Sequence, residues 1–538
     1  MAIPGITIRK APTAILTLFL LTVILLAITS THHSAKKINQ NSILAAPSLD
    51  EVHEAHGAVS NTLYKIGTCD MPSVMLSDDS IIVPGSLHYD LSGSRIVFAE
   101  GHYFNPSLLA TPAGSPFPYV GFARFGVGHV HKVAWCTMVW KRRPITKKHY
   151  IECESKVQYL AAPRFQNKPG TCVRIPFLAL DQGLTDPRVF YSPFGEPLML
   201  IGTNSHVICL GQYVIDLRAL IPELGEMLHI ENVPIRYPTY TELTRPLPLS
   251  EIDKNFIMYF DLNNEAYVAH DLSPKQVISS VERPVLNVAD GKSNCIADLT
   301  EENVHAHQAT TALRVTLCAF PCIPTEENTV LIAIVHNKYE SPKYPDVLYR
   351  RYLIVMNPNP PFNILARSRH LVFTGVNSNN FIFAVSLAWD FSKRTRPSWK
   401  EYEAKFAEND SASMKRRKAK RSIVGASQKL IERREEKPTT AKKGSSDPDA
   451  PMAWAQIADV DQMIHKMPLQ YSNPIASDFF HGWLDDVIMV NYGVADQESA
   501  SFHSTARQLL ECLIPCGDLP EHLGAVIKPS EETPVENL

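Results

Sequence analysis

Prolines and glycines interrupt this chain so often that long helices have little room to form. The 538 residues include 40 prolines and 24 glycines, which separate short runs rich in β-branched and aromatic residues. Such runs between turn residues are typical of β-strands, whereas a helix needs roughly ten or more periodic residues. Hydrophobic residues make up 45% of the chain, which is enough for a large core. We therefore expect an all-β fold with few short helices.

The expected strands are spread over most of the chain. They cover residues 95–99, 133–140, 197–201, 207–214, 256–260, 266–270, 312–318, 330–336, 349–356, 371–374, 381–387 and 487–492. Helices are expected at residues 218–224, 274–281 and 505–513. The second of these would begin with Ser273 as the N-cap and Pro274 as the first helical residue.

Three segments repeat one order of elements, namely a strand, a turn, a second strand and a short helix. They span residues 186–224, 254–281 and 485–513. Repeated units of this kind favour a radial β-propeller, because each blade is a small antiparallel sheet that packs on its neighbours. A pair of sheets stacked as a β-sandwich is the alternative.

The N-terminal segment predicts entry into the secretory pathway. Residues 14–28 carry no charge and follow Arg9 and Lys10, which is the pattern of a basic region before an apolar one. Residues 11–30 just reach the roughly 20 residues needed to span a membrane. We therefore favour an N-terminal hydrophobic anchor helix in a single-pass type II membrane protein, with most of the chain in the lumen of the Golgi or ER. The alternative is a secreted protein, cleaved near residues 27–30.

Ten cysteines in a lumenal chain lead us to expect disulfides. The nearest neighbours in sequence are Cys318 with Cys322 and Cys512 with Cys516, but the sequence leaves the connectivity open. No arrangement of paired cysteines and histidines matches a structural zinc site, so we expect no bound metal.

Charge is distributed unevenly along the chain. The net charge of −3 gives no reason to propose nucleic acid as a partner. Residues 391–450, however, contain 17 Lys or Arg and 9 Asp or Glu with few apolar residues, which predicts a disordered insertion. The expected organisation is a cytoplasmic tip and signal anchor (1–35), a stalk or linker (36–68), propeller blades (69–390), the charged insertion (391–450), the last blade with a closing helix (451–520) and a flexible tail (521–538).

Three motifs, in this order, resemble those of the five-bladed β-propeller proteins of carbohydrate metabolism. They are Asp186-Pro187-Arg188 before "VFYSPFGEPLMLI", Asp253-Lys254-Asn255 before "FIMYF", and Asn491-Tyr492-Gly493 with Asp496 in "NYGVAD". The group includes the β-mannoside phosphorylases, related mannosyltransferases and hydrolases and, more distantly, glycoside hydrolase family 43. The resemblance covers residues 186–513, and it implies a propeller whose central funnel binds a sugar. Asp253 stands where Glu is commoner in the group, and Asn491 where Ser is commoner.

Glycosyl transfer generally uses two carboxyl groups, one as an acid and one as a base or nucleophile. Our first catalytic candidate is Asp186 and our second is Asp485, since only one of the adjacent Asp485 and Asp486 can face the funnel from a strand. A structural ion pair between Asp186 and Arg188 is the alternative for the first motif. The candidates for substrate binding are Arg188, Lys254, Asn255, His307, Arg314, His481, Trp483, Tyr492 and Asp496.

These observations together favour a lumenal glycan-active enzyme, either a glycosyltransferase or a glycosidase. Its expected partners are a glycan or sugar donor and, through the N-terminal helix, the membrane. The sequence contains no dinucleotide-binding fingerprint, P-loop or nucleophile elbow, and we expect no cofactor. The alternative is a non-catalytic glycan-binding or scaffold protein of the secretory pathway.

Overall fold

The computed structural model describes residues 63–393 and 479–524. Short gaps lie at residues 70–74, 77–79, 86–93, 100, 113–114, 147, 164–166, 168–169, 181, 274, 290–304, 323, 340–347, 374–380, 518 and 520–521. The predicted anchor, most of the stalk, nearly all of the charged insertion and most of the tail fall outside the described residues. No helix within the described residues is long and apolar enough to cross a membrane.

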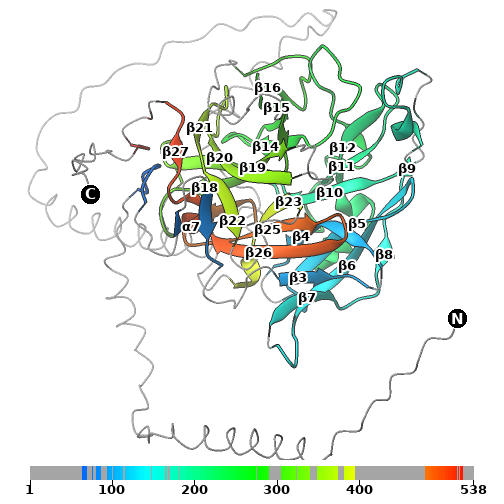
Figure 1. Ribbon diagram of the computed structural model, residues 1–538, viewed down its shortest axis with the longest axis horizontal. Coiled ribbons are helices and arrows are strands. Elements are labelled where there is room, and N and C mark those ends of the chain that lie inside the picture. Colours follow the sequence, from blue (N-terminus) through cyan, green and yellow to red (C-terminus); the bar gives the residue numbers. More distant parts are fainter. Residues whose placement is uncertain are drawn as a thin grey trace, which may run out of the picture. The chain divides into compact units, whose positions relative to one another are not determined.

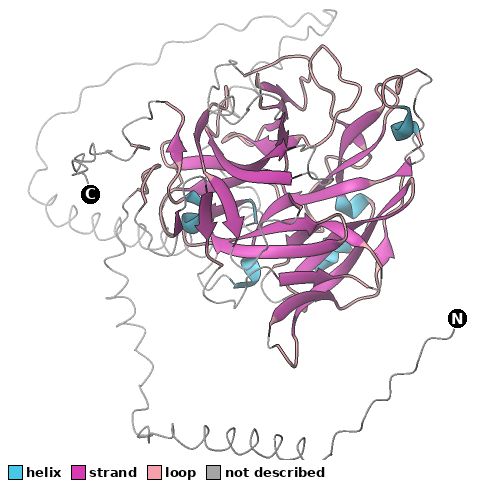
Figure 2. Cartoon of the chain, viewed as in Figure 1, coloured by secondary structure: helices cyan, strands magenta, loops and turns pink. Residues whose placement is uncertain are grey.

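Strands dominate the described part of the chain, and its helices are short (Figures 1 and 2). The α-helices are α3 (Leu224–Met227) and α7 (Ala506–Leu510), and the 3₁₀ turns are η1 (Pro176–Ala179), η2 (Leu217–Ala219) and η4 (Phe391–Lys393). The prediction of an all-β fold with few short helices is therefore confirmed for this part of the chain.

One antiparallel sheet contains the hairpin that begins with Asp186. Its strands, in spatial order, are β10 (Thr185–Tyr191), β11 (Pro197–Asn204), β12 (Leu210–Asp216) and β13 (Thr241–Glu242). The Ser192 amide donates to the Glu196 carbonyl at 2.9 Å, and Gly195 adopts a φ of 86° that favours glycine. The tight turn expected between these two strands is confirmed.

Three further sheets follow the chain order with few exceptions. The next sheet is antiparallel and contains β14 (Ile257–Phe260), β15 (Ala266–Asp271) and β16 (Val277–Ser280). A seven-stranded sheet contains β24 (His481–Trp483), β18 (Leu313–Thr316), β19 (Thr329–Tyr339), β20 (Leu348–Met356), β21 (Ile364–Arg367) and β27 (Ile514–Pro515), with β17 (His305–Gln308) also paired to β19. A small sheet contains β1 (Met75–Leu76), β2 (Ser80–Val83) and β22 (His370–Phe373).

The largest sheet joins the two ends of the described chain. Its order is β23 (Ile382–Trp389), β25 (Val487–Val494), β26 (Glu498–Thr505), β3 (Ser94–Val97), β7 (His149–Cys153), β6 (Val130–Arg142), β5 (Tyr119–Val127) and β4 (Tyr103–Ala110). Two short strands, β8 (Gln158–Tyr159) and β9 (Gln182–Gly183), pair with β6. The end strands β4 and β23 also lie against each other, so this sheet curls into a nearly closed, barrel-like arrangement.

Two of the three predicted helices differ from the structure. The segment predicted as a helix at 274–281 is instead strand β16, whose Ile278 pairs with Ala269 of β15. The β-branched Val277 and Ile278 suit a strand, and pairing with β15 satisfies their backbone groups. Residues 218–224 are divided between η2 and the start of α3. The third helix is confirmed as α7, which Thr505 opens with a capping box.

Four disulfides join described residues. They are Cys69–Cys512, Cys136–Cys153, Cys172–Cys209 and Cys318–Cys322. Of the two neighbouring pairs in the sequence, only Cys318 and Cys322 bond to each other, because Cys512 bonds to Cys69 near the start of the described chain.

Candidate functional site

A cavity of about 160 Å³ lies beside the start of β10. Four of its lining side chains are charged, namely Arg124 of β5, Asp186 and Arg188 of β10, and Lys254 from the segment before β14. The other lining residues are His131, Leu178, Gly183, Thr185, Gly202, Asn204, Leu210, Gln212 and Asn255. The structure thus brings four of the predicted site residues, Asp186, Arg188, Lys254 and Asn255, into one cavity.

A β-bulge turns the Asp186 side chain out of the regular strand. The pairing between β10 and β11 shifts register between Thr185 and Arg188, and Asp186 has a φ of 52°. Aspartate tolerates this left-handed conformation better than most residues. Pro187 has no N–H to donate, but a residue within a bulge is not paired in the ladder, so no ladder hydrogen bond is lost. The Asp-Pro-Arg motif therefore sets the position of the carboxylate through its backbone.

Strand β4 contains a second bulge of the same kind. Asn105 has a φ of 51° and is followed by Pro106, and the register shifts between Phe104 and Ser107. The Asn105 side-chain amide donates to the Asp186 carboxylate at 2.8 Å. Two Asx-Pro bulges on different strands therefore face each other at the site.

The environment of Asp186 keeps its carboxylate ionised. Burial opposes the charge, but the charge of Arg124, the hydrogen bond from Asn105 and the charge of Arg188 outweigh it, so that the pKa of Asp186 falls to about 2. The Arg124 guanidinium lies 3.1 Å from the carboxylate oxygen. About a quarter of the Asp186 side chain stays exposed, which leaves a negative charge accessible from the cavity.

Arg188 is fixed more tightly than Asp186. Its side chain is buried, its Nε donates to the Ala309 carbonyl at 2.6 Å, and its Nη2 donates to the Asn255 side-chain oxygen. Burial lowers the pKa of Arg188 to about 10, against the opposing charge of Asp186. The backbone amide of Asn255 donates a hydrogen bond of 2.9 Å to the side-chain oxygen of Gln212. Arg188 is therefore a positioned cation that joins β10 to the segment before β14 and to the segment after β17.

A lysine and two histidines lie near this pair. Burial lowers the pKa of Lys254, while the charge of Asp186 raises it and those of Lys338 and Arg124 lower it further. Burial also depresses the pKa of His336 well below its ordinary value, assisted by the charges of Arg351 and His307, which keeps His336 neutral. The candidate His307 pairs with His336 across β17 and β19 and is partly buried.

Asp496 supplies a second carboxyl group near Asp186. It lies in the turn between β25 and β26, where it has a φ of 49° and is exposed to solvent. Enough protein surrounds its carboxyl for burial to raise the pKa, and the negative charge of Asp186 raises it further, while Arg124 lowers it. Asp186 and Asp496 therefore have pKa values shifted in opposite directions.

Asp485, our second catalytic candidate, is not part of this group. It precedes β25, whereas Asp496 follows β25, and eight residues of extended chain separate the two ends by roughly 25 Å. Its exposed carboxylate instead accepts a hydrogen bond of 3.1 Å from the Phe320 amide. Asp485 therefore lies at the opposite end of β25 from Asp496, and it does not line the cavity beside Asp186.

The remaining four candidates pack within the protein. Arg314 is buried, donates to the Phe260 carbonyl at 3.2 Å and stacks 4.6 Å from the Phe480 ring centre. His481 hydrogen-bonds Thr316. The indole of Trp483 donates to the Cys322 carbonyl at 2.7 Å, and Tyr492 lies in the main core. None of these four lines the cavity beside Asp186.

Sequence reasoning missed two residues that contact Asp186. Asn105 carries a recognisable signal, since Asn105-Pro106 before "SLLA" repeats the Asp186-Pro187 pattern before an apolar strand. Arg124 carries none, because it is an ordinary strand residue that reaches the site through the pairing of Arg124 with Phe104. No group of three His, Cys, Asp or Glu residues among those described is arranged to hold a metal ion.

Comparison with family models finds none that matches this chain, and a search of curated proteins finds no match either.

Proposed function

We propose that the sheets form a five-bladed β-propeller. Five antiparallel units support this proposal: β10–β13, β14–β16, β18–β21, and the two parts of the largest sheet, which are β4–β7 and β23, β25 and β26 completed by β3. The parallel pairing of β3 with β7 joins those last two units. The first strands β4, β10 and β23 lie against one another, as innermost strands around a narrow centre would. Strand β3, from the start of the described chain, would complete the last blade, and closure of this kind protects sheet edges.

We propose that the protein is an enzyme that transfers a glycosyl group to or from a phosphate-bearing molecule, with its active site at the centre of this fold. One observation carries the proposal: the accessible carboxylate of Asp186 shares a 160 Å³ cavity with Arg124, Arg188 and Lys254. Three cations against one anion leave an excess of positive charge, which favours an anionic ligand. Arginine forms bidentate hydrogen bonds with phosphate, and lysine adds a compact charge.

The two carboxyl groups would divide the chemistry. Asp186, with its pKa near 2, would stay ionised and stabilise the positive charge that develops on the sugar ring. Asp496, whose pKa is raised by burial and by the charge of Asp186, would be the proton donor. Two titratable groups whose environments separate their pKa values are the usual basis of such an assignment.

A non-catalytic glycan-binding protein is the second candidate. It is favoured by the position of Asp496, which lies outside the residues that line the cavity, so that Asp186 is the sole carboxylate among the described lining residues. In that case Asp186 would bind sugar hydroxyls without turnover.

We also propose that the protein works in the lumen of the secretory pathway, anchored by its N-terminal segment. The disulfides between described residues support this location, because thiols stay reduced in the cytosol.

Calorimetric titration of the full-length protein tests the anionic site. Inorganic phosphate and sugar 1-phosphates should bind the wild type, and Lys254→Ala should weaken binding about tenfold or more. Lys275→Ala removes an exposed lysine outside the cavity and should leave the affinity unchanged. Equal affinity in all three proteins would contradict the proposed site.

Turnover distinguishes the enzyme from the binding protein. With manno-oligosaccharides as acceptors and sugar phosphates or nucleotide sugars as donors, Asp186→Asn should lower the rate at least about 100-fold. Asp496→Asn should abolish the decline in rate as the pH rises through the raised pKa of this group. Wild-type binding without turnover for any donor would establish the glycan-binding alternative.

A further inference from the structure

A second cavity adjoins the cavity beside Asp186. Its volume is about 940 Å³, near the upper end of the roughly 300–1,000 Å³ common for ligand pockets. His131, Gly183 and Asn204 line both spaces. Because these three residues line both cavities, we propose that the larger cavity binds an oligosaccharide of several sugar units and presents one end of it to the cavity beside Asp186. The proposal rests on the glycosyl-transfer function above.

The backbone at the junction leaves no room for side-chain atoms. Gly183 has a φ of 96°, and a Cβ atom there would lie 1.9 Å from the His131 carbonyl oxygen. The close pairing of Gly183 with His131 places strand β9 against β6 at the boundary of the two cavities. Only glycine therefore allows β9 to pack this closely against β6 where the two cavities meet.

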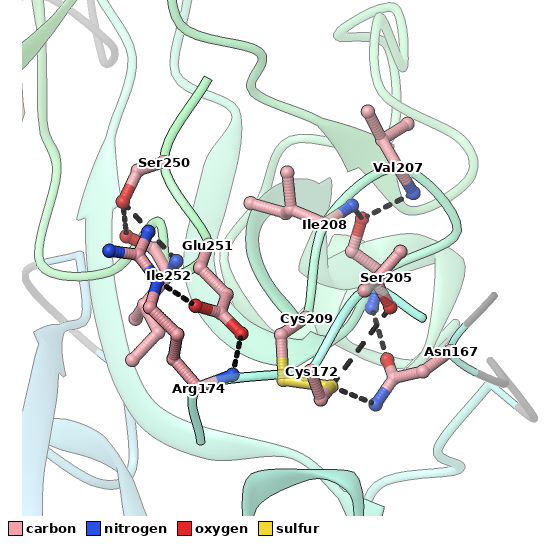
Figure 3. The surroundings of a disulfide bond; sticks show 11 residues. Asn167, Cys172, Arg174, Ser205, Val207, Ile208, Cys209, Ser250, Glu251 and Ile252 are labelled. Carbon is pink, nitrogen blue, oxygen red and sulfur yellow. Dashed lines mark hydrogen bonds and ion pairs between the residues drawn. A yellow bond between two sulfur atoms is a disulfide. The ribbon is translucent and has the colours of Figure 1, made fainter. Parts of the chain in front are cut away.

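Residues beside a disulfide line part of the larger cavity. Figure 3 shows the surroundings of this disulfide. Cys172 lines the cavity and bonds to Cys209 in the connection between β11 and β12. The Arg174 amide and Nε donate to the two carboxylate oxygens of Glu251 at 2.9 and 3.0 Å. The Asn167 side chain donates to Cys172 Sγ and accepts from the Ser205 amide, at 3.2 Å in each case. This part of the lining is thus held in place before any ligand arrives, which reduces the entropy cost of binding.

The lining combines an aromatic face with polar groups. The Tyr159 side chain is 43% exposed, and its hydroxyl hydrogen-bonds that of Tyr103 at 3.0 Å. The Lys132 ammonium lies 5.3 Å from the Tyr159 ring centre. Asn167 and Gln182 add amide groups, and no carboxylate occurs among the described lining residues. An exposed ring beside amide hydrogen-bonding groups suits a sugar, which has both apolar C–H faces and hydroxyl groups.

Binding of oligosaccharides of increasing length to the full-length protein tests the proposal. The probes are neutral manno-, gluco- and xylo-oligosaccharides of one to four units, titrated by calorimetry and by saturation-transfer NMR. At least one series should bind more tightly as it lengthens. Tyr159→Ala should weaken the longest probe about tenfold or more, and Tyr159→Phe should retain most of the affinity because it keeps the ring.

Tyr150→Ala provides a matched control. Tyr150 is a partly exposed tyrosine in the same sheet and also contacts a cation, Arg143, but it does not line the cavity. This variant should bind as the wild type does. Phosphate binding should be unchanged in Tyr159→Ala, which also shows that the variant is folded.

The outcomes separate the two proposals. Absence of binding by every oligosaccharide, or equal affinity in Tyr159→Ala and the wild type, would overturn the oligosaccharide site. Absence of phosphate binding in the wild type, together with oligosaccharide binding that depends on Tyr159, would overturn the proposed reaction and leave the larger cavity as a glycan site.

Discussion

The side chains of Asn105 and Asp186 reach each other because their backbones leave the ordinary strand conformation. Each residue has a positive φ within a bulge, and each is followed by proline. Backbone conformations of this kind cost of order 1 kcal/mol or more and concentrate at functional sites. The hydrogen bond between the two side chains and the charge of Arg124 stabilise the resulting carboxylate.

Asp253 gives the clearest pH dependence at the scale of one residue. Its side chain is buried, and its Oδ1 lies 3.7 Å from Nη1 of Arg245. Burial raises its pKa to about 7, against the opposing charge of Arg245, and the negative charges of Asp271 and Glu242 also raise it. The folded protein therefore retains this proton up to about pH 7, whereas the unfolded chain releases it near pH 4. The stabilisation that results from this difference in pKa is complete below about pH 4 and declines as the pH rises to about 7.

Asp253→Asn should remove that decline. We expect the free energy of unfolding of the variant, relative to the wild type, to increase by about 2 kcal/mol between pH 5 and pH 8. Urea unfolding of both proteins at the two pH values measures this difference. The exposed Asp485 provides the control, since Asp485→Asn should show no such change. A relative stability of Asp253→Asn that is the same at both pH values would refute the prediction.

Among the elements, a buried network joins β23, β26 and β5. The Asp390 carboxylate, just after β23, accepts hydrogen bonds of 3.0 Å from the Tyr119 hydroxyl and 2.6 Å from Ser392, and lies 3.1 Å from Nδ1 of His503. The Nε2 atom of His503 is 3.1 Å from the hydroxyl of Ser501. Ser501, His503 and Asp390 are connected in the same sequence of hydrogen bonds as a hydrolase triad. They are buried, however, and line neither the cavity beside Asp186 nor the larger cavity that adjoins it. We therefore interpret the network as structural.

Asp390→Asn should destabilise the fold strongly. The amide nitrogen cannot accept the hydrogen bonds that the carboxylate oxygens receive, so buried donors lose their partner. We expect the free energy of unfolding to fall by about 3 kcal/mol in urea. Arg95→Ala breaks an exposed ion pair with Glu498 and should cost less than about 1 kcal/mol. Similar losses in both variants would show that the network contributes no more than a surface pair.

The elements show which parts of the fold and site the sequence could predict. Strands with continuous apolar runs, such as β19, were predicted because few other structures fit such runs. The helix predicted at residues 274–281 is wrong, because Ser273-Pro274 resembles a helix start whereas pairing with β15 makes this segment strand β16. Asp186 was found from its motif. Arg124 could not be found, since its place depends on how β4 pairs with β5.

At the scale of the whole described chain, its early and late segments are held together. The Cys69–Cys512 disulfide joins residues 443 positions apart, and Ile66 forms a bridge with Gly524. Strand β3 pairs with β26 a few residues before α7. The sequence could not predict the Cys69–Cys512 pairing, because even cysteine numbers leave many connectivities open and Cys516 is the nearer neighbour of Cys512.

Removing this long-range disulfide should cost more than removing a local one. In the chain-entropy account, a cross-link stabilises the fold by restricting the unfolded chain, and the effect grows with the length of the closed loop. Cys69→Ser/Cys512→Ser should therefore lose about 6 kcal/mol of unfolding free energy, and Cys318→Ser/Cys322→Ser, which opens a loop of only 4 residues, about 2 kcal/mol. Urea unfolding of the two double variants and the wild type, under non-reducing conditions, gives the comparison. If the short-loop variant loses as much stability as the long-loop variant, then the closure between distant parts of the chain is maintained by strand pairing and packing, and the disulfide adds little to it.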